Sequence, residues 1–309
     1  MTDPVPKWHS AWEPFTPRGV AAFAGGSFGR LFLAQLIMAG LAAVSLAFFL
    51  QHAWFPVVTA AIESLPADEV KISHANLNWT GDSPAQLAQN HFLSLAIDLD
   101  HSGTLGRESH LQVEFGRDDL RLYSQFGLGY LEYDYVPGRE MPFNRAELKP
   151  WWGAWKPFIL VGTMLGTIAA LMITWTVMAT IYFLPVWIIS FVENRDLNLR
   201  QSWRLAGAAL MPGTLFMALG IFAYAMGVFD LLKLGTALGL HFIIVWLYLL
   251  ISPLFCPRHA AKEPTSANPF STAKEKPANA NPNPFAAPPP TNPPPDTKIA
   301  APENKKPSL

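Results

Sequence analysis

The chain has 309 residues, of which 50% are hydrophobic and only 15% are charged, and its formal net charge is −1. So few charges are unusual for a soluble protein of this size and indicate a membrane protein. The composition argues against a cytosolic enzyme, a basic nucleic-acid binder and, because Cys256 is the only cysteine, a secreted scaffold with internal disulfide bonds.

The N-terminal segment, residues 1–30, contains widely spaced aromatic and proline residues before the first long apolar run. Val20, Phe23 and Phe28 favour a short interfacial helix over Gly19–Arg30, whereas the glycines at 25, 26 and 29 weaken it. The apolar run that follows is too long and too far from the start for a cleavable signal peptide. We therefore expect a cytoplasmic segment followed by a retained membrane helix.

Four windows of the sequence contain no Asp, Glu, Lys or Arg: Leu31–Ile62, Phe158–Val192, Leu205–Phe229 and Gly235–Cys256. A helix needs about 20 apolar residues to cross a bilayer, so each window can cross once. The sequence predicts a membrane α-helical bundle with four transmembrane helices, over residues 31–55, 158–184, 205–229 and 235–256.

Residues 66–150 are the part of the chain that can form a domain in water. Leu93, Leu95, Ile97 and Leu99 alternate with smaller or polar residues, which is typical of a strand, and weaker alternation occurs at 70–79, 111–115, 120–122 and 128–135. We expect a small extracytoplasmic β-rich (α+β) domain, an antiparallel sheet packed on one face. The first membrane helix should extend outward until Pro66 stops it.

Prolines suggest where the later helices end or begin. The second window is too long for one perpendicular crossing, so the membrane span should end near Pro185, with Val186–Val192 in the inner membrane interface. Pro212 should start a new helix or kink one, and Leu197–Met211 would then lie partly along the membrane surface.

Residues 257–309 differ from the rest of the chain, because they hold 14 of its 28 prolines and few apolar side chains. Such a segment cannot bury enough surface to offset the entropy of ordering. It is predicted to be a disordered cytoplasmic Pro-rich tail.

Basic residues near the predicted helices indicate the orientation. Arg30 before the first predicted helix, Arg204 before the third and Arg258 after the fourth all lie on one side of the membrane. The long loop on the other side, residues 63–156, carries 14 acidic and 8 basic residues. The positive side should be cytoplasmic. We therefore expect a bacterial inner-membrane protein with both termini inside and residues 56–157 outside, although Arg145, Lys149 and Lys156 run against this rule.

Two groups in the outer domain could hold a metal ion. Asp98–Gly103 spaces oxygen ligands as calcium loops do, but position 12 is Ser109, so a strand-ending turn with Gly103 at positive φ is favoured. His74, His91, His101 and His110 match no ligand spacing and are expected to be scattered surface residues. No metal site is predicted.

Polar residues inside the predicted spans are few: Gln35, Gln51, His52 and His241. No Asp, Glu, Lys or Arg lies inside the predicted spans, which argues against a proton-coupled or ion-coupled pump, and His241 could bond across helices. Gly162/Gly166 and Gly235/Gly239 have the spacing that lets helices pack closely, either within the bundle, which is favoured, or between subunits.

The chain shows no protease, hydrolase or phosphate-loop motif. We therefore expect no catalytic residues, no cofactor and no enzyme activity. Cys256 is expected to be a passive boundary residue rather than an acylation site.

Three segments together resemble a known family: Pro14–Pro17 before the first span, Ile97–Gly103 in the outer domain, and Leu199–Pro212 entering the third span. Over about residues 10–257 the layout is similar to an uncharacterised group of bacterial Yip-type multi-pass membrane proteins. Proteins of that type usually have about five helices, against four here. The resemblance implies a non-enzymatic scaffold or trafficking-type partner and transfers no catalytic residues.

The leading hypothesis is a membrane scaffold or sensor that links an extracytoplasmic β-domain to a flexible cytoplasmic tail. The alternatives are a transporter or a transporter-associated subunit, and a membrane-bound enzyme. The expected partners are the lipid bilayer and either another protein or a second copy of the chain, and no nucleic acid.

Overall fold

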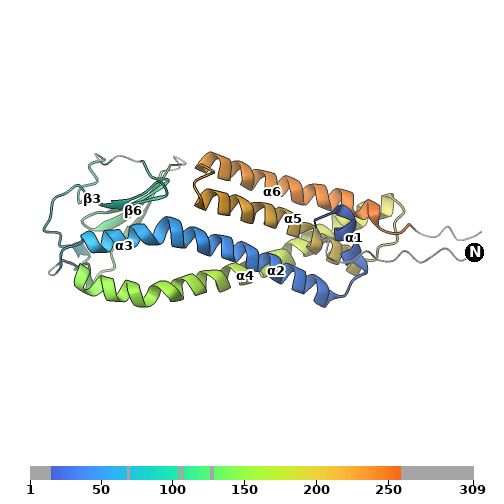
Figure 1. The fold of residues 1–309 in the computed structure, drawn as a ribbon, viewed down its shortest axis with the longest axis horizontal. Coiled ribbons are helices and arrows are strands. Elements are labelled where there is room, and N and C mark those ends of the chain that lie inside the picture. The colour runs from blue at the N-terminus through green and yellow to red at the C-terminus, as the bar shows by residue number, and fades with distance from the viewer. Residues whose placement is uncertain (1–14, 68–69, 104, 106–107, 126–128, 259–309) are drawn as a thin grey trace, which may run out of the picture. The chain divides into compact units, whose positions relative to one another are not determined.

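The computed structural model of the protein describes residues 15–67, 70–103, 105, 108–125 and 129–258 (Figure 1). Four of its helices are long and apolar enough to cross a membrane, and a small β-sheet region accompanies them. The coarse fold expectation is thereby confirmed. Residues 1–14 of the N-terminal segment and residues 259–309 of the predicted tail lie outside the described residues.

The short helix expected near the N-terminus is present. Helix α1 (Pro17–Gly25) starts where the Thr16 hydroxyl accepts a hydrogen bond from the Gly19 N–H at 3.0 Å. It ends at Gly26, and helix α2 (Phe28–Phe49) begins after Ser27 in the same way. The predicted helix over 19–30 is therefore interrupted near its glycines and is two elements.

Helix α2 continues without a break through a widened π turn, η1 (Leu50–Trp54), into α3 (Phe55–Ser64). Pro56 is the second residue of α3, just after the wide turn, and its ring nitrogen cannot donate the hydrogen bond that a regular helix requires. The helix ends just before Pro66, as predicted.

Helix α4 (Arg145–Val192) contains Pro150, Pro157 and Pro185 and continues through all three. The helix itself therefore continues past Pro185, near which the membrane span is predicted to end. Val186 and Ser190 are buried against the bundle, and this packing maintains the helix beyond the proline. Val186–Val192 are its last two turns rather than a separate segment.

Helix α5 (Leu199–Ala225) occupies the centre of the bundle and packs against α1, α2, α4 and α6 (Figure 1). In its most apolar stretch 61% of residues are buried, against 6% in α4. Residues 205–213 are all buried, so the second half of Leu197–Met211, a segment predicted to lie partly along the membrane surface, packs inside the bundle instead. The helix also runs through Pro212 without restarting.

Small residues explain why α5 is central. The Nε2 atom of Gln35 in α2 lies 3.3 Å from the position that a Cβ would take on Gly207. The carbonyl oxygen of His241 in α6 lies 2.8 Å from the corresponding position on Gly213, so only residues without a side chain allow the helices to come this close. In contrast, a Cβ on Gly162, Gly166, Gly235 or Gly239 would meet nothing within 4 Å. The predicted packing of these two glycine pairs inside the bundle is therefore wrong.

Helix α6 (Leu231–Ile251) follows a turn at Gly227, whose φ is +72°, so α5 ends at Ala225 rather than at 229. A 3₁₀ turn, η2 (Ser252–Phe255), completes the fourth apolar segment. We call the end of the bundle near α1 and η2 the α1 end, and the opposite end, next to the strands, the sheet end.

The strands form two sheets. The smaller has the order β2 (Asn76–Leu77), β1 (Lys71–Ser73) and β8 (Met141–Pro142). The larger has the order β3 (Ala85–Gln89), β4 (Leu93–Ile97), β5 (Leu111–Phe115), β6 (Asp119–Ser124) and β7 (Tyr130–Asp134).

The expectation of an antiparallel sheet is wrong at one pairing, because β4 and β5 run parallel, with Leu93 opposite Leu111. The chain between them returns as a crossover instead of a hairpin. As a result β4 is a central strand that is buried on both faces, and not on one face as predicted. Strand β7 lies at the edge, and all its residues are exposed.

Candidate functional site

The most connected polar residue between the strands and the helices is Asn90, in the turn between β3 and β4. Its side-chain oxygen accepts hydrogen bonds from the N–H groups of Phe92 and Leu93, both at 2.9 Å. Its side-chain nitrogen donates to the carbonyl of Ala53, inside the π turn, at 2.6 Å. One asparagine therefore shapes a strand turn and holds it against the first long helix.

A second connection joins the sheet to α5. His110, just before β5, shares a 2.5 Å hydrogen bond between its Nδ1 and the Tyr224 hydroxyl, and the two rings stack with centroids 5.5 Å apart. His91 lies edge-on to His110 with ring centroids 4.1 Å apart. The histidine is 6% exposed, so water cannot easily replace its tyrosine partner.

Aromatic rings surround this hydrogen bond. Tyr224 packs against Phe49 of α2 at 5.4 Å and against Phe92 at 5.0 Å between ring centroids. Phe49 and Phe92 also meet each other edge-on at 5.8 Å. We name Phe49, Asn90, His91, Phe92, His110 and Tyr224 the junction cluster, because they connect the larger sheet to both α2 and α5.

The electrostatics of the junction cluster depend on pH. Burial, together with the positive charge of nearby His91, lowers the pKa of His110, although the carboxylate of Asp230 opposes the shift. His110 is therefore held neutral at pH values where an exposed histidine would begin to take up a proton. A neutral imidazole can share one hydrogen bond with the tyrosine hydroxyl without burying a charge.

A second polar cluster lies on the larger sheet, around β5 and β6. Nε2 of His101 is 2.6 Å from Oδ1 of Asp119, and its Nδ1 is 3.4 Å from Oε2 of Glu114. The Arg121 guanidinium donates to the other oxygen of Asp119 at 2.9 Å. Opposite charges thus meet inside the sheet, which suits a structural ionic network.

The Asp98–Gly103 segment is a strand-ending turn, as favoured over a calcium loop. The Asp98 carboxylate accepts hydrogen bonds from the Ser102 hydroxyl at 3.0 Å and the Gly103 N–H at 3.3 Å, and Gly103 has φ +68°. Burial disfavours ionisation of Asp98, but these hydrogen bonds outweigh it and lower the pKa of the carboxyl group.

The expectation that all four outer histidines are surface residues is wrong for His110 and for the side chain of His101, which is 9% exposed. His74 and His91 are exposed. Across the described ranges, no three His, Cys, Asp or Glu side chains gather in a way that could hold a metal ion.

The polar residues of the apolar helices have local roles. Gln35 is buried and donates to the Gly207 carbonyl at 3.1 Å, which joins α2 to α5. Gln51 is exposed, and His52 bonds to the Phe48 carbonyl of its own helix. His241 bonds to Leu238 of its own helix, so the suggested bond across helices is wrong.

Cys256 is buried at the α1 end and 3% exposed, and its carbonyl accepts a hydrogen bond from Arg195 at 2.9 Å. Asn90 and Tyr224 were not predicted as functional residues. The only sequence signal near them is Pro56, which marks an irregular helical turn without indicating what contacts it.

Comparison of the chain with protein families, with curated proteins and with solved structures finds no match. The resemblance to Yip-type proteins therefore stays a prediction.

Proposed function

We propose that this protein is a non-enzymatic integral membrane scaffold or sensor, in which an outer β-rich domain is coupled to a helical bundle and, through it, to a cytoplasmic tail. The observation that carries the proposal is the junction cluster. Two of its hydrogen bonds, from Asn90 to Ala53 and between His110 and Tyr224, tie one sheet to two different helices. A change in the sheet would therefore shift α2 and α5 together.

The helices themselves extend the coupling beyond the bundle. Helix α3 continues α2 outward, and its Thr59 hydroxyl accepts a hydrogen bond from the Trp152 ring of α4 at 2.9 Å. Lys149 of α4 also forms an ion pair with Glu63 of α3 at 3.2 Å. Two of the four apolar helices thus support the outer domain, as a rigid mount for a sensor requires.

The proposed orientation places both termini in the cytoplasm and residues 56–157 outside a bacterial inner membrane. The arginines at the α1 end and the acidic excess of the sheet region support it. In this arrangement the exposed strand β7, with Leu131 61% exposed, faces the outside, where it is open to a protein ligand.

Coupling can be measured with the single native cysteine as the reporter. Cys256 is buried at the opposite end of the bundle from Tyr224, so its rate of reaction with N-ethylmaleimide reports opening of the α1 end. Tyr224→Phe removes only the hydroxyl that bonds to His110. In lipid nanodiscs we expect this change to raise the labelling rate about fivefold, at the lower end of allosteric coupling energies.

Tyr135→Phe is the matched control, because Tyr135 is also buried and its hydroxyl donates to the Gly116 carbonyl within the outer domain. It should leave the labelling rate of Cys256 unchanged. Equal labelling rates for the two variants would contradict the sensor proposal. The junction cluster would then attach the sheet to the helices without transmitting a structural change to the α1 end.

The scaffold role predicts a partner at the cytoplasmic side. Mild crosslinking in native membranes should capture a defined protein with the full chain but not with a chain truncated after Ala261. The truncated chain should still insert and keep its thermal stability. If the two chains capture the same proteins, the tail does not recruit a partner and this part of the proposal fails.

A further inference from the structure

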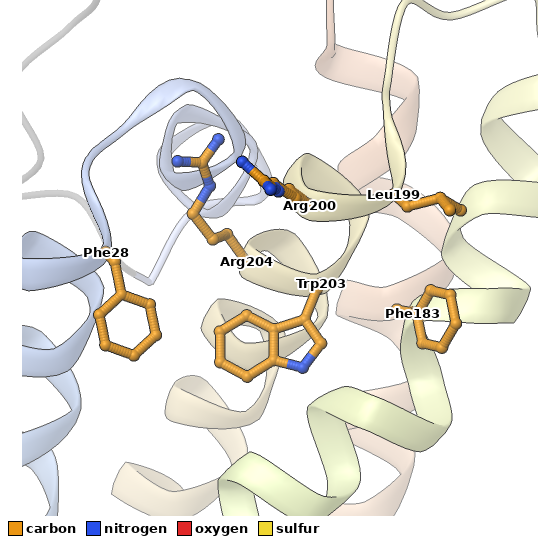
Figure 2. Close-up of a pocket in the computed structure, with 6 residues that line it drawn as sticks. All are labelled: Phe28, Phe183, Leu199, Arg200, Trp203 and Arg204. Atoms are coloured by element: carbon orange, nitrogen blue, oxygen red, sulfur yellow. The ribbon is translucent and has the colours of Figure 1, made fainter.

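A pocket of about 610 Å³ opens at the α1 end of the bundle, between α2, α4 and the first turns of α5 (Figure 2). Its lining residues are Phe28, Phe183, Leu199, Arg200, Trp203 and Arg204. We call it the Arg–Trp pocket. Its volume falls within the range of roughly 300–1,000 Å³ that is usual for small-molecule sites.

The apolar wall of the pocket is held in place. The ring of Trp203 stacks on Phe28 with centroids 5.8 Å apart and an interplanar angle of 23°. The indole N–H donates to the Thr180 hydroxyl of α4 at 3.1 Å, which fixes the ring between three helices. Phe183 lies on the other side of the opening in Figure 2. Such a wall is suited to a hydrocarbon chain.

The polar edge consists of two arginines with different bonding. Arg204 donates to the carbonyls of Gly26 and Ala24, at the C-terminal end of α1, at 2.6 and 2.7 Å. Its Nε is buried and has no hydrogen-bond partner within the described part of the chain. Arg200 is exposed, and no described residue forms a hydrogen bond or an ion pair with it. Both side chains therefore keep unused donors.

The surroundings of the pocket favour a negatively charged occupant. The charge-free stretch of α5 begins at Leu205, directly after Arg204, so the arginines lie where an apolar span meets the polar interface. The described residues at this end include six arginines and two acidic residues: Arg18, Arg30, Arg195, Arg200, Arg204 and Arg258, against Glu193 and Asp196. Basic pockets between membrane helices are typical sites for acidic lipid headgroups.

We propose that the Arg–Trp pocket binds one anionic phospholipid. The headgroup phosphate lies at Arg200, where a guanidinium can offer two parallel donors, and one acyl chain covers the rings of Phe28, Trp203 and Phe183. The proposal requires that the apolar helices span a membrane, but it does not depend on the scaffold or sensor role. It assigns a lipid-binding site to the junction of α2, α4 and α5.

Native mass spectrometry of the full chain in a neutral detergent tests this site. Phosphatidylglycerol and phosphatidylcholine with identical acyl chains are titrated separately, and the first bound lipid is counted. We expect the wild-type chain to prefer phosphatidylglycerol. Arg200→Ala should weaken that lipid about fivefold, the effect of one basic residue at an anionic surface, and leave phosphatidylcholine unchanged.

Three controls distinguish the source of the effect. Arg18→Ala removes the same charge from the same end but outside the pocket, and should change binding less than twofold. Arg200→Gln keeps a long polar side chain and should show the same loss as alanine. Phe183→Ala removes part of the apolar wall and should weaken both lipids alike.

Several results would overturn the proposal. Equal affinity for the two lipids would exclude headgroup recognition. Equal losses of phosphatidylglycerol affinity in the Arg18 and Arg200 variants would indicate diffuse electrostatic attraction by the whole basic end rather than a defined binding site. Displacement of phosphatidylglycerol by millimolar glycerol 3-phosphate would indicate a site for a small soluble anion and not for a lipid.

Discussion

Replacing Asn90 with alanine tests whether the junction cluster holds the larger sheet on the helical bundle. The change removes two hydrogen bonds within the β3–β4 turn and one to the Ala53 carbonyl. Each is worth about 1 kcal/mol net. Ala53 is completely buried, so water does not replace the Asn90 side chain as a hydrogen-bond donor to the Ala53 carbonyl. Asn90 itself is only partly buried, so water can reach the turn. We expect a loss of about 2–4 kcal/mol in the free energy of unfolding.

For a chain of this size each kcal/mol corresponds to about 2–4 °C in Tm, so the Asn90→Ala variant should unfold about 5–15 °C lower. Intrinsic tryptophan fluorescence of the full chain in nanodiscs follows the transition, since the chain contains 11 tryptophans. Asn90→Asp keeps the acceptor for the turn and loses the donor to Ala53, which separates the two contributions.

Asn78→Ala is the matched control, because Asn78 is exposed and donates one hydrogen bond, to the Ser73 hydroxyl at 2.7 Å. It should lower the Tm by about 3 °C or less, given about 1 kcal/mol for one hydrogen bond. If Asn90→Ala and Asn78→Ala lowered Tm equally, the contact between the β3–β4 turn and the π turn would add no more to the free energy of unfolding than an exposed hydrogen bond does. Our account of the junction would then be refuted.

Three further predictions concern helix packing, pH and orientation. Gly213→Ala would place a Cβ 2.5 Å from a methyl group of Val245 and 2.8 Å from the His241 carbonyl oxygen, so α5 and α6 must separate. Thermal unfolding should show a loss of about 1–3 kcal/mol in the free energy of unfolding. An unchanged Tm would contradict this packing. Since the folded state lowers the pKa of His110, the unfolded chain binds its proton more readily, so this contribution is complete above about pH 6.5 and declines as the pH falls toward the folded value. A Tm series over pH should show a smaller decline below pH 6.5 for His110→Phe than for wild type, and identical declines would argue against the shift. In a Cys256→Ser background, cysteines at Ser102 and Asp230 should react with an impermeant thiol reagent added to intact cells, and labelling of a cysteine at Asn198 would reverse the proposed orientation.

Local sequence signals located most of the elements of the fold. Each of the four charge-free windows coincides with a long apolar helix. These features depend on neighbours within a few residues. Alternation at 93–97 and 111–115 likewise located two strands of the larger sheet.

Pro66 marks a helix end as predicted, but Pro185 and Pro212 neither end nor restart a helix, because packing can outweigh a proline. Pro185 and Pro212 each remove one backbone donor, which would end an isolated helix. In the bundle Val186 and Met211 are fully buried next to these prolines, and the packing of neighbouring helices supports the turn.

The sequence by itself determined that the chain forms long apolar helices and a small β-rich domain, because hydrophobic patterning acts over short distances. Only the tertiary structure decided that β4 and β5 pair in parallel, that α5 is central, and that His110 meets Tyr224 across 114 residues. The same holds for the Arg–Trp pocket, whose walls come from three helices. Contacts of this kind depend on how separate elements pack, and no local pattern in the chain encodes which of them will meet.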